Sequence, residues 1–340
     1  GHEVLIESKA GEKANFSDND YSEAGAQIAY DTKAVYKADI ILKVEPLSPD
    51  ELELMQQGQT LISALQLPVQ SKDFLKKLIA KKVTAIAYDY IKDNTGSFPV
   101  IRAMSEIAGN SSILIAAEYL SNVNGGQGLM MGGISGVKPT EVVIFAEFAT
   151  RAALGLGASV KVFSNNTSKL RRLQDVVGRR VYTSTLQPKV IENALKDADV
   201  AIGAMRSPKS RSPIIVSEEM VQKMPEGSVI VDVSIDQGGC FETSRVTTHA
   251  NPTYKLHGVI HYCVPNIPSR AARTASYALS NIFAPVIIEL GDGGGIDHCI
   301  RKILSVRSGI YLYKGMLTNQ YLAEEFGLPY KDLDLLLAAY

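Results

Sequence analysis

Apolar and polar positions in the first hundred residues follow two different periods. Short β-branched runs with strand character are separated by stretches in which apolar residues recur with helical spacing. The predicted strands are 4–7, 40–44, 60–65 and 84–90, and the predicted helices are 21–29 and 71–80. Strands that alternate with helices require crossover connections, which favour a parallel sheet. Residues 1–100 are therefore expected to form an α/β domain or part of one.

The middle of the chain has the most diagnostic pattern. Continuous apolar, mostly β-branched runs alternate there with helical patterns. The runs are 141–145, 159–163, 200–203 and 228–233, and the helical patterns are 147–155, 168–175, 188–197 and 217–224. Strands without polar alternation are buried on both faces, as in a doubly wound parallel sheet. This pattern predicts a Rossmann-type, nucleotide-binding domain.

The remaining segments extend the α/β organisation along the chain. They predict a long helix at 104–120, a glycine-rich surface loop at 124–136, a strand at 257–262, a long helix at 273–290 kinked at Pro285, and helices at 316–326 and 331–339. We predict an α/β fold of two domains. A Rossmann-type domain with a doubly wound parallel sheet at 101–271 is inserted into a second α/β substrate domain, built from both chain ends at 1–100 and 272–340.

Composition and charge restrict the classes of function. The chain of 340 residues is 46% apolar and 21% charged, which is typical of a folded globular protein. Its net charge of -1 and the absence of a Lys/Arg stripe argue against a nucleic-acid partner, because phosphate binding depends on clustered cations. Because the sequence has no apolar run of membrane-spanning length and no signal pattern, we expect a cytoplasmic protein without a membrane partner.

Cysteine and histidine positions predict no metal site. Cys240, Cys263 and Cys299 are too scattered for a disulfide framework and form no CxxC pair, which favours a reducing compartment. His257 and His261 flank a predicted strand, where residues four apart are separated by roughly 13 Å, too far to share one ion.

The first strand of the predicted nucleotide domain lacks the expected phosphate-binding turn. Such strands end in a glycine-rich turn whose bare backbone lets a pyrophosphate approach the following helix. Here the strand 141–145 continues directly into a helical pattern without a glycine, although such connections commonly take about 2 to 6 residues. Two explanations are open: a loop left out of the sequence, which the abrupt start at Gly1 also suggests, or a true deletion that severely weakens cofactor binding. The GGQG run at 125–128 precedes the strand, which favours a surface turn.

Four segments resemble one known family over nearly the whole chain. They are LKVEP at 42–46, MSEIAG at 104–109, VIVDVSIDQGGCFET at 229–243 and HYCVPNIP at 261–268. The chain resembles the alanine dehydrogenase family and, more distantly, the nucleotide-binding subunit of transhydrogenase. The resemblance implies a two-domain α/β enzyme that reversibly converts L-alanine to pyruvate and ammonia with NAD. It also implies a homo-oligomer, since family members commonly form hexamers.

The resemblance assigns roles to two residues of the chain. Asp236 matches the family's active-site aspartate and follows a predicted strand, where open sheets place their ligands. Its carboxylate could position water or ammonia and steer a proton, but an aspartate before two glycines could also be a turn or cap residue. Lys43 matches the lysine that pairs with the substrate's carboxylate and carbonyl oxygen and stabilises charge developing on oxygen. Its alternative is a solvated strand-end lysine.

Gln66 is the departure that most affects the mechanism. It stands where better-known family members carry a catalytic histidine. Glutamine donates and accepts hydrogen bonds but cannot exchange a proton near neutral pH. Either the proton comes from elsewhere, such as water organised by Asp236, or the substrate or the activity differs.

The cofactor positions favour NAD over NADP. Ser164 ends the second strand of the nucleotide domain, where an NAD enzyme normally places an acidic residue for the ribose hydroxyls. Lys169, Arg171 and Arg172 lie downstream, so binding of NADP is one interpretation. The other, which keeps NAD, is that the serine is a tolerated substitution and that the basic residues lie on a solvated helix face.

Further cofactor contacts follow from the resemblance. The family positions around the dinucleotide match Ser105, Lys169, Asn266 and Ile267. Asn266 lies in a rigid loop between two prolines, whereas Ser105 could equally be a helix N-cap. The leading interpretation is an NAD-dependent L-alanine dehydrogenase. The alternatives are a catalytically impaired relative that acts in binding or assembly, and an enzyme for another 2-oxo acid and amino acid.

Overall fold

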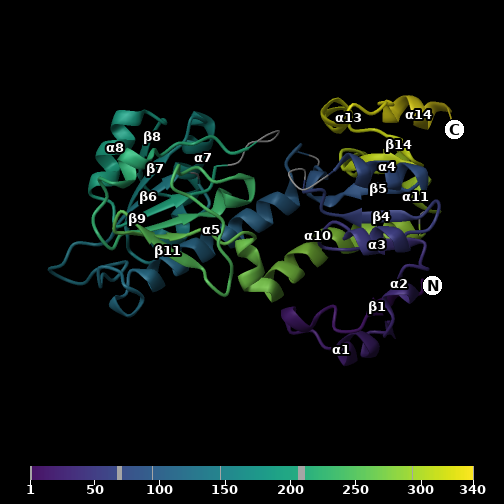
Figure 1. Ribbon diagram of the computed structural model, residues 1–340, viewed down its shortest axis with the longest axis horizontal. Coiled ribbons are helices and arrows are strands. Elements are labelled where there is room, and N and C mark those ends of the chain that lie inside the picture. The colour runs from purple at the N-terminus through teal and green to yellow at the C-terminus, as the bar shows by residue number, and fades with distance from the viewer. Residues whose placement is uncertain are drawn as a thin grey trace. The chain divides into compact units, whose positions relative to one another are not determined.

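The chain divides into two compact units (Figure 1). The computed structural model describes residues 2–66, 71–93, 95–145, 147–205, 211–292 and 294–339. The terminal unit comprises residues 1–103 and 272–340, and the central unit comprises residues 104–271. Our sequence prediction placed these boundaries at 100 and 271. The predicted α/β class with parallel sheets is confirmed.

The central unit is built on a seven-stranded sheet of order β11-β12-β10-β9-β6-β7-β8. Its strands are β6 (Glu141–Phe145), β7 (Ser159–Phe163), β8 (Tyr182–Ser184), β9 (Val200–Gly203), β10 (Val229–Asp232), β11 (Thr253–Leu256) and β12 (Val259–Tyr262). Every neighbouring pair is parallel except β11 with β12. The chain runs outward from β6 to β8 and then returns to β9 on the other side of β6. The sheet therefore has the strand order of a dinucleotide-binding domain, with its switch point between β6 and β9.

Both faces of the central sheet are covered by apolar side chains, as predicted. Along β6, Val142 and Ile144 join one buried cluster, whereas Val143 and Phe145 join another. This alternation explains why the strand is apolar throughout. The helices of this part of the chain are α5 (Pro99–Tyr119), α6 (Thr150–Gly155), α7 (Thr167–Val177), α8 (Pro188–Lys196) and α9 (Glu218–Val221), with short 3-10 segments η4 (Asn122–Asn124), η5 (Val233–Gln237) and η6 (Ile267–Ala271).

The connection between β6 and α6 corrects one sequence prediction. The helix was expected from residue 147, which left essentially no connection, but it begins at Thr150. Residues 146–149 therefore join strand and helix, and the described part of this connection packs closely on α5. A Cβ added at Gly109 would lie 2.7 Å from the backbone carbonyl carbon of Phe148 and 2.8 Å from the nitrogen of Ala149. The connection between β6 and α6 is therefore formed by residues that were predicted to be the first turn of the helix.

The terminal unit contains a five-stranded sheet of order β14-β13-β5-β4-β3. Its strands are β3 (Ile40–Leu42), β4 (Thr60–Ser63), β5 (Thr84–Ala87), β13 (Ile310–Tyr313) and β14 (Met316–Leu317). The first three are parallel neighbours, and β13 pairs antiparallel with both β5 and β14. Because β13 comes from the tail and β5 from the first hundred residues, both ends of the chain contribute to one sheet. The strand β13 was not predicted from the sequence.

Helices cover this sheet, and a small two-stranded sheet lies in the same unit. The helices are α1 (Asp18–Glu23), α2 (Thr32–Val35), α3 (Pro49–Leu54), α4 (Lys72–Ala80), α10 (Ala272–Asp292), α11 (Ile296–Lys302), α12 (Leu304–Arg307), α13 (Gln320–Phe326) and α14 (Leu333–Ala339), with 3-10 segments η1 (Glu12–Ala14) and η3 (Tyr88–Tyr90). The predicted helix at 21–29 is wrong. Gly25 has a φ of 97°, which ends α1, and the chain then forms β2 (Gln27–Ala29) beside β1 (Leu5–Glu7).

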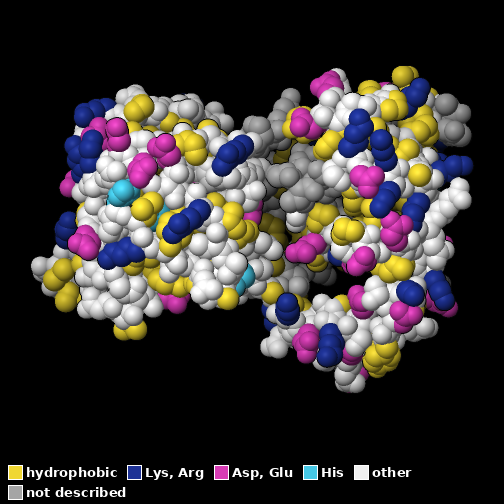
Figure 2. Space-filling view, in the orientation of Figure 1, with side chains coloured by type: hydrophobic (Ala, Val, Ile, Leu, Met, Phe, Trp, Pro, Cys, Tyr) yellow, Lys and Arg dark blue, Asp and Glu magenta, His cyan; other side chains and the backbone are white. Residues whose placement is uncertain are grey.

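The surface carries mixed charge. Basic and acidic side chains are interspersed over the face shown in Figure 2. Within the described residues, no helix combines the length and apolar character needed to cross a membrane.

His261 makes the stability of the central unit depend on pH. It is fully buried, where its Nδ1 donates to the carbonyl oxygen of Val259 at 3.0 Å and its Nε2 lies 2.8 Å from the Thr243 hydroxyl. Burial lowers its pKa to about 4, although the hydrogen bond to Val259 acts to raise it. A histidine with a lowered pKa stabilises the fold in its neutral form, so this contribution is lost as the pH falls from about 6.5 through about 4.

The His261 effect should appear in the free energy of unfolding. We expect acidification over this range to remove roughly 2 to 3 kcal/mol of stability through His261. Urea unfolding followed by circular dichroism at several pH values would measure it. The control is His261→Gln, which stays neutral. An equally steep loss of stability in that variant would contradict the assignment.

Candidate active site

Three candidate residues lie at the carboxyl edge of the central sheet. Ser164 follows β7, Asp236 lies in η5 directly after β10, and Asn266 follows β12. Parallel strands end at the same edge, which is where open α/β sheets bind ligands. The Asp236 carboxylate is exposed and accepts a hydrogen bond from the backbone N–H of Asn266 at 3.0 Å. The fold thus links the candidate catalytic aspartate to the candidate cofactor loop, which continues into the buried Ile267.

The local backbone explains the position of Asp236. The 3-10 segment η5 ends at Gly238, whose φ of 92° is left-handed and turns the chain back. The residue that caps η5 is Asp232, so the cap role considered for Asp236 is wrong. Asn266 itself has a φ of 53°, which is uncommon for a residue other than glycine. Asparagine is one of the residues that adopt this backbone conformation most readily, so the chain can turn here and bring the Asn266 N–H to Asp236.

Basic residues of α7 meet a carboxylate from the first βα connection. Glu147 follows β6, and its Oε1 lies 3.2 Å from Arg172 and 3.9 Å from Lys169. Lys169, which the family resemblance places near the dinucleotide, is therefore paired with an acidic side chain of the chain itself. Nearby, Ser164 is buried, and its hydroxyl accepts from the backbone N–H of Asn166 at 3.2 Å.

The chemistry of these residues suits the two ends of a nicotinamide dinucleotide better than its middle. The Ser164 hydroxyl is of a kind that can hydrogen-bond a ribose, and the loop at Asn266 lies at the same edge of the sheet. At the start of α6, the hydroxyl of Thr150 is buried without a hydrogen-bond partner among the described residues, so an acceptor there would satisfy it. Glu147 and the bulky Phe148, however, stand where the bare glycine backbone of a phosphate turn is expected.

Ser105 lies within α5. Its helix begins at Pro99, so the alternative that Ser105 is an N-cap is wrong. The side chain is half-buried in the part of α5 that belongs to the central unit.

The terminal unit gathers a second set of candidate residues at the carboxyl edge of its sheet. Lys43 directly follows β3, and its backbone N–H donates to Ile62 of β4 at 2.9 Å. Gln66 follows β4 with a left-handed φ of 45° and an exposed side chain. After β5, Asp89 accepts from the backbone N–H of Leu65 at 3.0 Å. Lys43, Gln66 and Asp89 thus share one edge.

The ammonium of Lys43 forms an ion pair with Glu51. Both side chains are mostly buried, so Lys43 is not the solvated strand-end lysine of the alternative interpretation. Burial opposes ionisation of Glu51, but hydrogen bonds from Lys43 and Ser48 hold its pKa below the ordinary value. Burial and the nearby Glu51 carboxylate also raise the pKa of Tyr36. The Lys43 ammonium therefore lies beside a carboxylate that hydrogen bonds hold in place.

Glu51 and Asp89 were not predicted from the sequence as site residues. A signal for Glu51 was present, because Ser48 and Glu51 have the spacing of a capping box, which the structure forms at the start of α3. That motif predicts a helix start but not the ion pair with Lys43.

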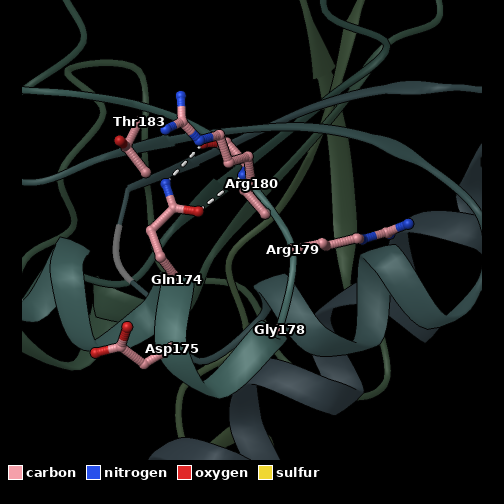
Figure 3. Close-up of a pocket in the computed structure, with 7 residues that line it drawn as sticks. Gln174, Asp175, Gly178, Arg179, Arg180 and Thr183 are labelled. Carbon is pink, nitrogen blue, oxygen red and sulfur yellow. Dashed lines mark hydrogen bonds between the residues drawn. The ribbon is translucent and has the colours of Figure 1, made fainter.

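An open pocket elsewhere on the central unit is not the candidate site. Figure 3 shows its lining at the end of α7, where the side-chain amide of Gln174 bonds to both backbone groups of Val181 at 2.9 Å. Val181 precedes β8, so the pocket lies at the amino edge of the sheet. Ser164 and Asp236 lie at the opposite, carboxyl edge.

Comparison with known proteins identifies the family. The model described as alanine dehydrogenase/PNT, N-terminal domain, matches residues 1–108, and the corresponding C-terminal domain matches residues 112–320. The chain belongs to the alanine dehydrogenase/PNT family. The resemblance drawn from the sequence is thereby confirmed.

Relatives of this family match the chain over nearly its whole length. Alanine dehydrogenase 2 of Staphylococcus aureus (strain USA300) is 38% identical over 340 residues, which cover 98% of this chain and 91% of that protein. Alanine dehydrogenase of Mycolicibacterium smegmatis is 39% identical over 345 residues, covering 99% and 92%. The solved structure of an L-alanine dehydrogenase matches with a TM-score of 0.89 and 36% identity, covering 96% of this chain and 91% of that chain.

A more distant relative shares the fold alone. The structure of a transhydrogenase from Sinorhizobium meliloti matches with a TM-score of 0.78 at 20% identity, covering 94% of this chain and 91% of that chain. The alanine dehydrogenase/PNT fold therefore persists at low sequence identity, and membership of the family implies a nicotinamide cofactor.

Proposed function

We propose that this chain is an L-alanine dehydrogenase, which reversibly converts L-alanine, water and NAD to pyruvate, ammonium, NADH and a proton. The observation that carries the proposal is the exposed Asp236 carboxylate, tied to Asn266 at the carboxyl edge of a sheet with dinucleotide-binding strand order. The named alanine dehydrogenases that match over nearly the whole chain support it. We further propose a cytoplasmic homo-oligomer, with a hexamer as the expected state.

In the proposed mechanism, the chain's own residues handle charge and protons. A nicotinamide cofactor, which Ser164 and the loop at Asn266 would hold, would supply the hydride acceptor for deamination and the hydride donor for the reverse reaction. Lys43 binds the substrate carboxylate and stabilises negative charge on the carbonyl oxygen. The Asp236 carboxylate orients water or ammonia and takes up or releases the proton. Gln66 can hold a hydrogen bond but not a titrating proton, so it orients without exchanging protons.

The forward reaction gives a direct test. Purified protein with L-alanine and NAD should produce pyruvate and NADH in equal amounts, and L-lactate should not replace L-alanine. Production of pyruvate from L-lactate instead would assign the chain to a different substrate class.

One observation favours a second candidate, a catalytically impaired relative that acts in binding or assembly. Glu147 places a carboxylate in the connection where a pyrophosphate would approach, and like charges oppose each other there. A protein of this kind would keep the oligomer but show no turnover with any 2-oxo acid. A different 2-oxo acid or amino acid substrate would instead appear as turnover in a substrate screen.

Cofactor choice at Ser164 provides a prediction. Because Glu147 pairs with Arg172 and lies within 3.9 Å of Lys169, it offsets part of the positive charge that α7 could offer to a 2′-phosphate, which supports NAD. Ser164→Asp should raise the NADH-to-NADPH preference about tenfold, since a carboxylate binds ribose hydroxyls and repels a 2′-phosphate. Steady-state kinetics with both cofactors measures the ratio. The control Ser164→Ala removes the hydroxyl without adding charge, and an unchanged ratio in the aspartate variant would contradict this role.

Gln66→His tests where the proton moves. Histidine tolerates the left-handed backbone at this position. If Asp236 carries the proton, kcat should change by no more than about twofold, because a correctly placed acid or base is worth about 10²- to 10⁴-fold. The pH–rate profile is the measurement, with Gln66→Asn as the control. A large increase in kcat, with a new ionisation in the histidine range, would assign the proton to position 66.

A further inference from the structure

A second aspartate is buried just before the candidate catalytic one. Asp232 is the last residue of β10, and its exposed fraction is 0%. Its two oxygens accept hydrogen bonds from the segment that follows, residues 234–244. The donors are Ser234 N (3.0 Å), Ser234 Oγ (2.6 Å), Cys240 N (2.9 Å), Phe241 N (3.4 Å) and Ser244 Oγ (2.6 Å).

This environment uses Asp232 as an acceptor and not as an ion-pair partner. Backbone N–H groups can only donate, so three of its bonds require an oxygen that accepts. Within the described ranges, no Lys or Arg side chain forms an ion pair with it. Burying a carboxylate is costly unless hydrogen bonds compensate it, and an apolar residue would pack at a strand end without that cost. The side chain therefore serves the segment that wraps around it.

The surrounding backbone is in direct contact with this carboxylate. A Cβ added at Gly239 would lie 2.6 Å from Asp232 Oδ2, and one added at Gly203 of β9 would lie 3.1 Å from Oδ1. Gly239 also has a φ of 79°, which disfavours other residues. The turn after Asp236 thus closes onto Asp232, and its geometry depends on that side chain.

We propose that Asp232 is a positioning residue for Asp236. Its carboxylate fixes both ends of the segment 233–244, so that the Asp236 carboxylate is presented at the sheet edge and held to the Asn266 N–H. The inference rests on the proposed function, since it assigns Asp232 to the catalytic geometry of that site. Asp232 acts through Asp236 and need not contact the substrate.

The kinetic test is a double-mutant cycle with Asp232→Asn and Asp236→Asn. Asparagine replaces one acceptor oxygen by a donor, and both orientations then place an N–H group against a backbone N–H. We expect Asp232→Asn to lower kcat about 30-fold in the wild-type background, but less than about threefold beside Asp236→Asn. The milder Ser244→Ala removes one of the same hydrogen bonds and should show the same dependence on Asp236.

Thr140→Val is the matched control for lost stability. Thr140 is buried in the same unit before β6, and its hydroxyl donates to the carbonyl oxygen of Met130 at 3.0 Å, away from the carboxyl edge. We expect Thr140→Val to change kcat by the same factor in the wild-type protein and in Asp236→Asn. If Asp232→Asn and Ser244→Ala also have equal effects in both backgrounds, Asp232 is only structural and the proposal is overturned.

Hydrogen exchange provides a readout that does not need activity. In Asp232→Asn, or in Ser244→Ala if the first does not fold, amides of 233–244 and of the Asn266 loop should exchange at least about tenfold faster. Thr140→Val should leave both segments unchanged. Unchanged exchange in the Asp232 and Ser244 variants would overturn the positioning role. Absence of alanine turnover in the wild type, with faster exchange in the variants, would instead overturn the proposed function.

Discussion

Asp236→Asn is expected to reduce kcat for L-alanine oxidation by about 10²- to 10⁴-fold, the usual contribution of a positioned general acid or base. The amide oxygen can still accept from the Asn266 N–H, so the loop contact at 3.0 Å is preserved while proton transfer is lost. Steady-state kinetics measures the loss, and NADH binding measured by fluorescence should stay within about threefold of the wild type.

The comparison variant Asp236→Ala separates the two roles of this side chain. Alanine removes both the carboxylate and the acceptor for Asn266, so it should weaken NADH binding as well as lower kcat. Equal NADH binding in the alanine and wild-type proteins would show that the contact with Asn266 does not order the cofactor loop. A kcat near the wild-type value in Asp236→Asn would exclude Asp236 as the proton-transfer residue.

The second large effect is expected at Lys43. Lys43→Met keeps a long, flexible side chain but removes the cation that we propose binds the substrate oxygens. We expect kcat/KM for pyruvate to fall by about 10²- to 10³-fold, the loss typical when an oxyanion-stabilising group is removed. The variant also leaves Glu51 without its main cationic partner, so the pKa of the Glu51 carboxyl should rise.

Glu51→Gln distinguishes the charge of Lys43 from its placement. The ammonium remains, but the carboxylate that holds it is gone. We expect a smaller loss of kcat/KM, about tenfold, carried mainly by a higher KM for pyruvate. Equal losses in Lys43→Met and Glu51→Gln would mean that the ion pair stabilises the fold and does not bind substrate.

The middle of the central sheet could be predicted from the sequence because its strands are short, β-branched and apolar on both faces, whereas the outer strands β8 and β11 were not predicted. The strands 141–145, 159–163 and 200–203 coincide with β6, β7 and β9. Errors arose where one residue or turn overrides a local pattern. Gly25 interrupts the helical spacing at 21–29. After β6 the chain must reverse direction, so residues before Thr150 form the connection although their spacing is helical.

The candidate site was only partly accessible to sequence reasoning. Asp236, Lys43 and Asn266 could be proposed by family resemblance, because they lie in specific motifs. The ion pair of Lys43 with Glu51 depends on how α3 packs beside β3, which no spacing along the chain reveals. The role proposed for Asp232 depends on its burial among backbone N–H groups up to Phe241 and the hydroxyl of Ser244, 12 residues ahead. Such contacts become visible only in three dimensions.

Reductive amination tests the central claim most directly. Purified protein, pyruvate, ammonia and NADH are mixed, and absorbance at the nicotinamide band is followed with and without ammonia. The proposed function requires an ammonia-dependent loss of absorbance that disappears in Asp236→Asn, with L-alanine as the product. No loss of absorbance with either NADH or NADPH would contradict the assignment as an alanine dehydrogenase.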